Sequence, residues 1–225
     1  WLYTANLLEE VCEEVFISGD QISQETFTTI PDKVKNIGPI GGLVSAFSHD
    51  NDSSWFVLAC DLPLVDKAII HSMVSNCSDH HVTCAVSEDK PEPLISIWPS
   101  KLLKVIQDQI KRGVYSIHDL LDNANLVDIP GENATNVNTR VDYYRIKKYL
   151  PYVPIDCNYY DHIESSALLH NARIEFFDGE KILSIQGKIE TTEITNHQEY
   201  LILASGNRIR MDMIVSINKF PNPTI

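Results

Sequence analysis

The apolar positions of the first 150 residues follow two alternating patterns. Several stretches carry apolar residues at helical spacing, and short, continuously apolar runs stand between them. The helical stretches are residues 2–12, 40–49, 66–75, 101–111 and 116–122, and the apolar runs are residues 14–18, 55–60 and 81–86. Strands that are apolar throughout are typical of a sheet buried on both faces. The pattern therefore predicts an α/β fold with a mostly parallel sheet.

The pattern changes after Pro151. One helical stretch, residues 160–169, precedes short strand-like runs at residues 172–177, 182–189, 199–203 and 208–211. Turns that contain Gly179 and Gly206 separate some of these runs, as is typical of antiparallel structure. We therefore expect two domains, residues 1–150 and residues 151–225, of which the second is a small antiparallel β-barrel.

The composition indicates in which cellular compartment the protein is located. No apolar run approaches the length that crosses a bilayer, and Glu9 and Glu10 near the start argue against a signal peptide. The five cysteines are scattered, odd in number and without CxxC pairs. This usage favours reduced thiols in the cytoplasm.

The net charge of the chain restricts the kinds of molecule that it can bind. The formal net charge of −13 argues against direct binding to nucleic acid, because phosphates repel an acidic surface. Residues 1–150 carry 12 Lys and Arg against 21 Asp and Glu, and residues 151–225 carry 6 against 10. An acidic enzyme that binds a nucleotide usually needs a divalent cation to do so.

Asp61 is the first candidate for chemistry. It directly follows the apolar run of residues 55–60, at the end of a predicted strand where ligands bind in open α/β sheets. A carboxylate there can hold Mg²⁺ between the phosphates of a nucleotide and the attacking group. The alternative is that Asp61 only begins the turn before Pro63.

A glycine-rich turn, IGPIGG, leads directly into a predicted helix. Gly38, Pro39, Gly41 and Gly42 belong to this turn, whose glycines let a ring or phosphate approach the backbone. The start of the helix also favours anions. Asp32 lies six residues before Gly38 and can accept hydrogen bonds from a base or a ribose, although a lone Asp in a loop can also simply be solvated.

Asn136 and Asn138 are spaced so that, on a strand, both amides would converge on one site. Thr139 and Asp142 then predict a capping box at the start of the following helix. The alternative is a simple strand-to-helix connection in which the asparagines serve turns. That alternative explains Thr139 well and the paired asparagines poorly.

Five short segments share a characteristic order and spacing. They are Ile30-Pro31-Asp32, Gly38-Pro39-Ile40-Gly41-Gly42, Leu58-Ala59-Cys60-Asp61-Leu62-Pro63, Glu92-Pro93-Leu94 and Asn136-Val137-Asn138-Thr139. Over residues 1–148 the chain thereby resembles the MobA family of molybdenum cofactor guanylyltransferases. The resemblance implies a Rossmann-like nucleotidyltransferase that transfers GMP from GTP to molybdopterin and releases pyrophosphate.

The resemblance also implies roles for the candidate residues. Asp61 would ligate Mg²⁺, and Asp32 with the loop of residues 38–42 would face the guanine nucleotide. Asn136 and Asn138 would lie near the phosphate of the pterin.

The sequence departs from the family pattern at two places. Ser18 stands where the family usually has an Asn that contacts the nucleotide. The family also opens with a strand and the loop LAGGxSxRMGxDK, which cradles the phosphates and supplies a catalytic Lys; roughly 30–35 residues of this kind are absent before Trp1. We expect an N-terminus that was trimmed or cleaved, a gap at the centre of the sheet, and no activity without the loop. The alternative is a degenerate, inactive homologue.

Residues 152–217 contain a second group of related segments. They are Tyr152-Val153-Pro154-Ile155-Asp156-Cys157, Tyr160-Asp161-His162-Ile163-Glu164, Glu199-Tyr200-Leu201 and Ile209-Arg210-Met211-Asp212. They resemble the Rof-type antiterminators, which implies an Sm-like barrel preceded by a helix and a protein partner similar to the termination factor Rho. An acidic module suits this role because it competes with RNA for a basic surface. The alternative is a structural appendage or a dimerisation barrel.

Two other functions fit part of the sequence. A cytidylyltransferase or a sugar-nucleotide pyrophosphorylase would share the fold, but residues 38–42 together with residues 136–139 argue against it. A non-catalytic regulatory protein would act through the Rof-like barrel and keep the first domain as a relic.

Overall fold

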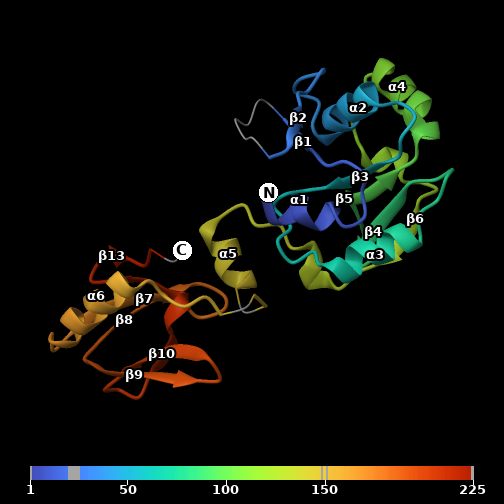
Figure 1. Cartoon of the computed structure of the whole chain (residues 1–225). Coiled ribbons are helices and arrows are strands. Elements are labelled where there is room, and N and C mark those ends of the chain that lie inside the picture. Colours follow the sequence, from blue (N-terminus) through green and yellow to red (C-terminus); the bar gives the residue numbers. More distant parts are fainter. Residues whose placement is uncertain (1, 20–25, 148, 151, 224–225) are drawn as a thin grey trace. The chain divides into compact units, whose positions relative to one another are not determined.

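The computed structural model describes residues 2–19, 26–147, 149–150 and 152–223 (Figure 1). The chain divides into two compact units, Trp1–Asn136 and Val137–Ile225. Pro151, where the sequence pattern changes, lies outside the described residues. The boundary predicted from the sequence resemblances lies after residue 150. The boundary between the two compact units lies earlier, after Asn136. Helix α5 (Arg140–Ile146) therefore falls in the second unit.

The first unit alternates helices and strands. Its helices are α1 (Leu2–Leu8), α2 (Pro39–His49), α3 (Lys67–Ser75) and α4 (Leu103–Lys111), with short 3₁₀ turns at Ser100–Leu102, His118–Leu120 and Gly131–Ala134. Its strands are β1 (Phe16–Ser18), β2 (Thr28–Ile30), β3 (Trp55–Leu58), β4 (Thr83–Ser87), β5 (Lys90–Trp98) and β6 (Asn125–Asp128).

The described strands of this unit form two sheets. β1 and β2 pair in parallel, and the other four strands lie in the order β3-β5-β4-β6. β5 runs antiparallel to both of its neighbours, while β4 and β6 are parallel, so β3, β4 and β6 share one direction. The α/β expectation is confirmed, and the mostly parallel sheet is in detail a mixed sheet with one reversed strand.

Helices cover both faces of the four-stranded sheet. Ala85 and Ile95 pack with residues of α1 and α3, including Leu7 and Ile70. Cys84, the neighbour of Ala85, faces the other way and packs with α2 and α4. This alternation explains why the strands are apolar throughout (Figure 1).

The second unit contains two helices and seven strands in its described part. The helices are α5 and α6 (Cys157–Ala167), and a 3₁₀ turn spans Met211–Met213. The strands are β7 (Ala172–Phe177), β8 (Ile182–Gly187), β9 (Ile189–Thr195), β10 (Gln198–Leu203), β11 (Arg208–Arg210), β12 (Ile214–Ile217) and β13 (Phe220–Pro221).

These strands form two antiparallel sheets, β13-β12-β7-β8 and β11-β10-β9. The antiparallel expectation is confirmed, but no closed barrel is detected among the described strands. Both sheets share one core with α6, to which Tyr159 and Ile163 of α6, Ile174 of β7 and Leu201 of β10 contribute. No helix in the described part of the chain is long and apolar enough to cross a membrane.

Candidate functional site

The carboxyl ends of β1 and β2 bring two predicted residues to the start of α2. Ser18 ends β1 and Asp32 follows β2, and because the strands are parallel, both lie at the same edge of their sheet. A Cβ atom placed on Gly42 would lie 2.6 Å from Ser18 Oγ and 3.9 Å from Asp32 Oδ1. The structure therefore groups Ser18, Asp32 and Gly42 at the N-terminus of α2.

The glycine turn needs glycine for two different reasons. Gly38, the residue that caps α2, has a φ of 71°, which side chains rarely adopt, and Pro39 then begins the helix. At Gly41 a Cβ atom would lie 2.9 Å from the carbonyl oxygen of Val34. The positive φ of Gly38 thus sets the shape of the turn, and the missing side chain at Gly41 lets the backbone of Val34 in the preceding loop approach the helix.

Asp32 presents a buried oxygen atom without a partner. Its Oδ1 makes no hydrogen bond in the structure. A buried acceptor that stays unsatisfied costs free energy, so this atom is suited to a donor that a ligand brings. A carboxylate can only accept, which restricts that ligand group to an N–H or O–H.

Ser45 holds the Asp32 loop against α2, and the sequence reasoning missed it. The backbone N–H of Lys33 donates to Ser45 Oγ at 2.9 Å, and Ser45 Oγ donates to the carbonyl of Gly41 at 2.8 Å. Ser45 is fully buried among the apolar residues of α2. A polar residue one turn after Gly41 on the apolar face of the helix was the available signal.

Asp61 and Asn136 meet, although 75 residues separate them. The chain beyond β3 is fixed by the N–H of Ala59, which donates to the carbonyl of Leu94 at 2.9 Å. Asp61 is half-buried, and its Oδ2 accepts a solvent-exposed hydrogen bond from Asn136 Nδ2 at 3.3 Å. The structure therefore places a carboxylate and an amide together beyond the end of a sheet strand.

The predicted strand through Asn136 and Asn138 was wrong. Strand β6 ends at Asp128, a 3₁₀ turn follows, and residues 135–138 form neither helix nor strand. The argument that both amides share one strand face therefore does not hold. The chain leaves the sheet before Asn136 because the residues ahead of α5 are used to cap that helix.

The capping box at α5 is confirmed. Thr139 Oγ1 accepts from the N–H of Asp142 at 3.2 Å, and Asp142 Oδ2 accepts from the N–H of Thr139 at 2.9 Å. The hydrogen bond from the Thr139 side chain lowers the pKa of Asp142. Asp142 Oδ2 also accepts from the backbone N–H of Asn138 at 3.3 Å, which ties Asn138 to the helix.

A magnesium ion fits Asp61 only with help from a ligand. Among the described residues, no three His, Cys, Asp or Glu side chains gather as a metal site. Mg²⁺ usually keeps several waters and binds one or two carboxylates together with substrate phosphates. The single, half-buried carboxylate of Asp61 suits a Mg²⁺ ion that nucleotide phosphates also coordinate.

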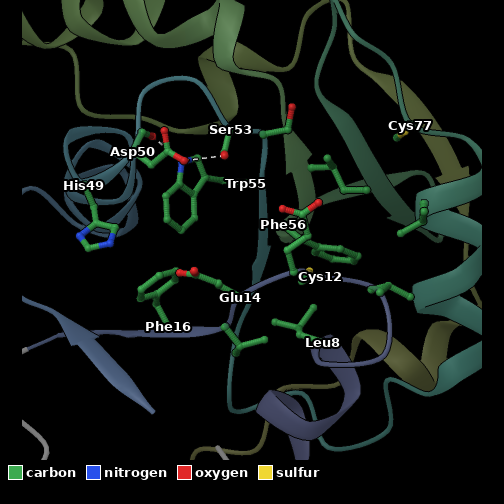
Figure 2. A pocket seen from close by; sticks show the side chains of 16 residues that line it. Leu8, Cys12, Glu14, Phe16, His49, Asp50, Ser53, Trp55, Phe56 and Cys77 are labelled. Carbon is green, nitrogen blue, oxygen red and sulfur yellow. Dashed lines mark hydrogen bonds between the residues drawn. The ribbon is translucent and has the colours of Figure 1, made fainter.

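A cavity of about 550 Å³ lies elsewhere in the first unit (Figure 2). Phe16 of β1 and Trp55 of β3 line it, with ring centroids 5.7 Å apart, and Trp55 Nε1 donates to the carbonyl of Asp50 at 3.1 Å. Cys12 also lines it, and burial raises the pKa of this thiol. None of the predicted site residues lines the cavity. It lies between β1 and β3, which are edge strands of the two sheets.

The fold and the residues at the strand ends define the class of the first unit. It is an α/β nucleotidyltransferase-like domain, similar to a solved structure from Aquifex aeolicus with a TM-score of 0.54 and 29% identity. That similarity covers 60% of this chain and 77% of the Aquifex chain. The family model described as the MobA-like NTP transferase domain matches residues 1–126. The chain therefore belongs to the MobA-like NTP transferase family.

Two curated relatives have the same printed description, "Probable molybdenum cofactor guanylyltransferase". The relative from Flavobacterium johnsoniae is 30% identical over 119 residues, which are 50% of this chain and 63% of the relative. The relative from Aquifex aeolicus is 33% identical over 146 residues, which are 61% of this chain and 72% of the relative. The chain thus spans less than two thirds of the Flavobacterium protein.

Proposed function

We propose that the protein is a molybdenum cofactor guanylyltransferase, which transfers GMP from GTP to molybdopterin and releases pyrophosphate. The buried, unpartnered Oδ1 of Asp32 beside Gly42 carries this proposal. The family membership and the descriptions of the two relatives support the reaction.

The proposed base specificity follows from hydrogen-bonding chemistry. The Watson–Crick edge of guanine offers N–H donors at N1 and N2, and the carboxylate of Asp32 accepts such donors. Adenine and cytosine also carry an exocyclic N–H₂ donor, but of the three bases only guanine offers two adjacent donors. Only guanine can therefore bind both oxygens of the carboxylate, and the missing bond discriminates between substrates. The absence of side chains at Gly41 and Gly42 leaves the backbone open to a flat ring, and the start of α2 favours the phosphates.

The proposed chemistry needs few groups from the protein. An oxygen of the terminal phosphate of molybdopterin attacks the α-phosphorus of GTP, the bond from this phosphorus to the bridging oxygen breaks, and pyrophosphate leaves with the electron pair. When bound, Mg²⁺ neutralises negative charge on the phosphates. Asp61 would hold this ion, and the amide of Asn136 keeps the Asp61 carboxylate in place. Asn136 and Asn138 would contact the molybdopterin phosphate.

We expect this activity in the cytoplasm. All five cysteines are free in the structure, which suits a reducing compartment. For the second unit we propose a Rof-like module with an Sm-like fold and a Rho-like protein partner. Its two antiparallel sheets around one core and the excess of acidic residues in residues 151–225 support this proposal.

The test is transfer from GTP, ATP or CTP to molybdopterin by the full-length gene product in Mg²⁺, with the dinucleotide product separated by chromatography. We expect transfer from GTP alone. Asp32→Asn, which replaces an acceptor oxygen by an N–H₂ donor, is expected to raise KM for GTP. Equal transfer from CTP would overturn the guanine assignment, and no transfer from any nucleotide would favour the non-catalytic alternative.

A further inference from the structure

The backbone that follows Asp32 lies along small residues of α2. A Cβ atom placed on Gly41 would lie 2.9 Å from the carbonyl oxygen of Val34, and the N–H of Lys33 donates to Ser45 Oγ at 2.9 Å. Residues 41 and 45 are about one turn apart and therefore share one face of the helix. This face of α2 thus contacts the two residues that directly follow Asp32.

Ser45 is the buried polar group at the centre of this contact. It is fully buried, and its Oγ donates to the carbonyl of Gly41 at 2.8 Å while it accepts from the N–H of Lys33. A hydroxyl has a single proton, so the bond to Gly41 leaves only lone pairs for the loop. The glycine turn and the loop that carries Asp32 are therefore both bound to one buried oxygen atom.

The bond to Lys33 restricts the position of Asp32 itself. The N–H of Lys33 belongs to the planar peptide group that begins at the Cα atom of Asp32, so one rigid plane connects the two atoms. Only two side-chain torsions then separate this Cα atom from the carboxylate oxygens, and each torsion has few favoured values. The hydroxyl of Ser45 therefore limits where the carboxylate of Asp32 can lie.

The carboxylate of Asp32 has the character of a binding group. Its Oδ1 is buried and has no hydrogen-bond partner among the described residues. An unrestrained side chain would turn such an oxygen toward water, because a buried acceptor without a partner costs free energy. The arrangement indicates that the surrounding structure holds this oxygen ready for a donor that a ligand brings, and the bond from Lys33 to Ser45 is part of that support.

We propose that Ser45 is a positioning residue for base selection: its buried hydroxyl holds the peptide group after Asp32, so that both carboxylate oxygens can bind the two adjacent donors of guanine at once. This inference rests on the proposed function, in which Asp32 binds the guanine of GTP. A bidentate contact needs both oxygens in place together, whereas a single bond tolerates a shift of the carboxylate. Loss of the Ser45 hydroxyl should therefore reduce the preference for guanine more than it reduces nucleotide binding as a whole.

Inosine triphosphate (ITP) is the probe for the second bond. Its base keeps the N–H of guanine at N1 but lacks the amino group at position 2, so it offers Asp32 only one donor. The ratio of the Kd values for ITP and GTP therefore measures what the second donor contributes. The measurement is calorimetric titration of the full-length gene product with each nucleotide in Mg²⁺.

The variants separate hydrogen bonding from packing. Ser45→Ala removes the hydroxyl, whereas Ser45→Cys keeps nearly the same volume but offers only a weak donor and a weak acceptor. Ser48→Ala is the matched control, because Ser48 is exposed and its Oγ donates one turn back to the carbonyl of Val44 at 2.7 Å, within α2 itself. The bond from Lys33 Nζ to the backbone carbonyl of Ser48 does not need the serine side chain and stays in this control.

We expect the wild type to bind GTP at least about tenfold more tightly than ITP. In both Ser45 variants this ratio should fall by about three- to tenfold, the effect of one hydrogen bond, while Ser48→Ala keeps the wild-type ratio. An unchanged ratio in the Ser45 variants, with or without an equal loss of affinity for both nucleotides, would overturn the inference. A fall in Ser45→Ala that Ser45→Cys does not share would trace the effect to packing and would overturn it as well.

Failure of the proposed function gives a different result. If the wild type prefers GTP to ITP but transfers no GMP to molybdopterin, the proposed reaction fails, and the ratios still decide the role of Ser45. If transfer is normal and the ratio does not change in the Ser45 variants, only the inference on Ser45 fails. A wild type that binds neither nucleotide would end both.

Discussion

Two neighbouring glycines in the first turn of α2 face different neighbours. Gly41 faces the backbone carbonyl of Val34, which cannot move aside, whereas Gly42 faces the hydroxyl of Ser18, which can rotate. Gly41→Ala is therefore expected to lower the free energy of unfolding by about 1–2 kcal/mol, after the helix preference of Ala offsets part of the clash. Gly42→Ala should leave stability nearly unchanged but lower the affinity for GTP about tenfold, because it fills space beside Asp32. Urea denaturation and calorimetric titration separate the two effects, and a stability loss at Gly42 that exceeds the loss at Gly41 would contradict the structure.

Asp61→Asn tests the proposed Mg²⁺ ligand. The change removes a negative charge with little change of shape, so we expect turnover to fall at least about a hundredfold. The one hydrogen bond shown for the Asp61 carboxylate in the described part of the chain is exposed to solvent, which predicts a thermal melt close to that of the wild type. The readout is pyrophosphate release by the full-length gene product.

Asp66→Asn is the matched control for Asp61→Asn. Asp66 caps α3 by accepting from the N–H of Ile69 at 3.0 Å, and Asn is an equally good cap. Turnover should therefore stay normal in this variant. Near-normal turnover in Asp61→Asn would mean that the metal is held elsewhere.

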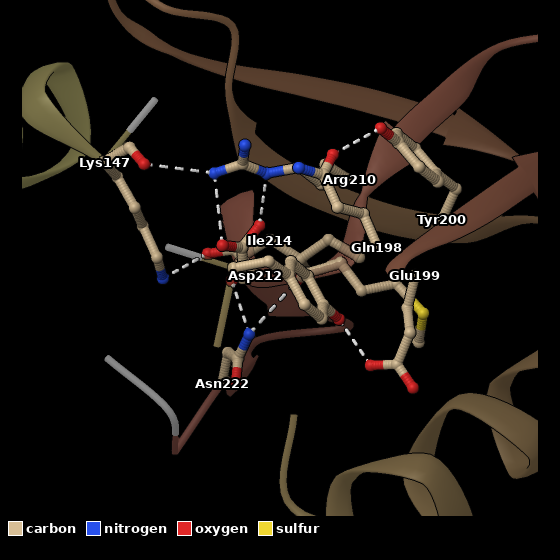
Figure 3. A network of polar contacts seen from close by, with 10 residues as sticks. Lys147, Gln198, Glu199, Tyr200, Arg210, Asp212, Ile214 and Asn222 are labelled. Atoms are coloured by element: carbon tan, nitrogen blue, oxygen red, sulfur yellow. Dashed lines mark hydrogen bonds and ion pairs between the residues drawn. The ribbon is translucent and has the colours of Figure 1, made fainter. Parts of the chain in front are cut away.

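Single residues differ in how far the sequence reveals them. Asp61 and Asp32 could be predicted from the sequence because each follows a strand. Ligands bind beyond the carboxyl ends of the strands in open α/β sheets, so position along the chain already marks both residues as candidates. Ser45 and the contact of Asp212 with Lys147 could not be predicted, because both depend on partners that only the folded chain brings close. Ser45 binds the backbone of the Asp32 loop, and Asp212 meets Lys147 across 65 residues (Figure 3).

At the scale of elements, two tyrosines connect α6 to β10. Tyr160 of α6 and Tyr152 ahead of it both donate to the carboxylate of Glu199. Burial, and then this carboxylate, raise the pKa of both tyrosines. The segments that resemble the Rof family therefore meet inside the unit, where they serve its structure.

The raised pKa values predict loss of stability in alkali. An unfolded tyrosine ionises near pH 10, whereas these tyrosines stay protonated in the folded unit, so the stabilisation is complete below about pH 10 and falls as the pH rises above it. We expect the urea midpoint of the second unit to fall steadily between about pH 10 and 11.5. Glu199→Gln should weaken this dependence, while Glu193→Gln on β9 should not. A midpoint that is independent of pH in this range would contradict the prediction.

Elements were predictable where the local pattern and the tertiary environment agree. The helix predicted at residues 66–75 is α3, because Asp66 supplies a cap and the apolar residues face the core. β5 was missed because Pro91 and Pro93 argue against a strand. The structure accommodates Pro93 at an irregularity within β5, where residues 93–95 have no partner in the register with β4. The predicted strand at residues 136–138 failed because the capping of α5 determines that segment instead.

At the scale of the whole molecule, the acidic balance of residues 151–225, with 6 Lys and Arg against 10 Asp and Glu, predicts salt-sensitive binding. If the second unit acts like a Rof domain, the full-length gene product should bind Rho from the same organism. The binding should weaken as salt rises, because exposed charges are screened beyond about 10 Å at 0.1 M ionic strength. Calorimetric titration with single-stranded RNA as competitor is the measurement. Displacement by RNA would support the proposal, and no binding to Rho, or direct binding of RNA to this protein, would leave a structural appendage as the better explanation.

The cavity beside Phe16 also bears on the behaviour of the chain in concentrated solution. β1 and β3 each have one edge without a partner among the described strands, and the cavity lies between those strands. Free rows of backbone N–H and C=O groups recruit other strands, so we expect chains of these 225 residues to associate edge to edge as concentration rises. Val15→Lys places a charge in this cavity and should suppress association, as measured by sedimentation velocity, whereas Val105→Lys on the exposed side of α4 should not. Purely monomeric behaviour at all concentrations would show that the free edges of β1 and β3 are blocked. Association that Val15→Lys suppresses would show that the solubility of the chain depends on what fills the cavity between these two strands.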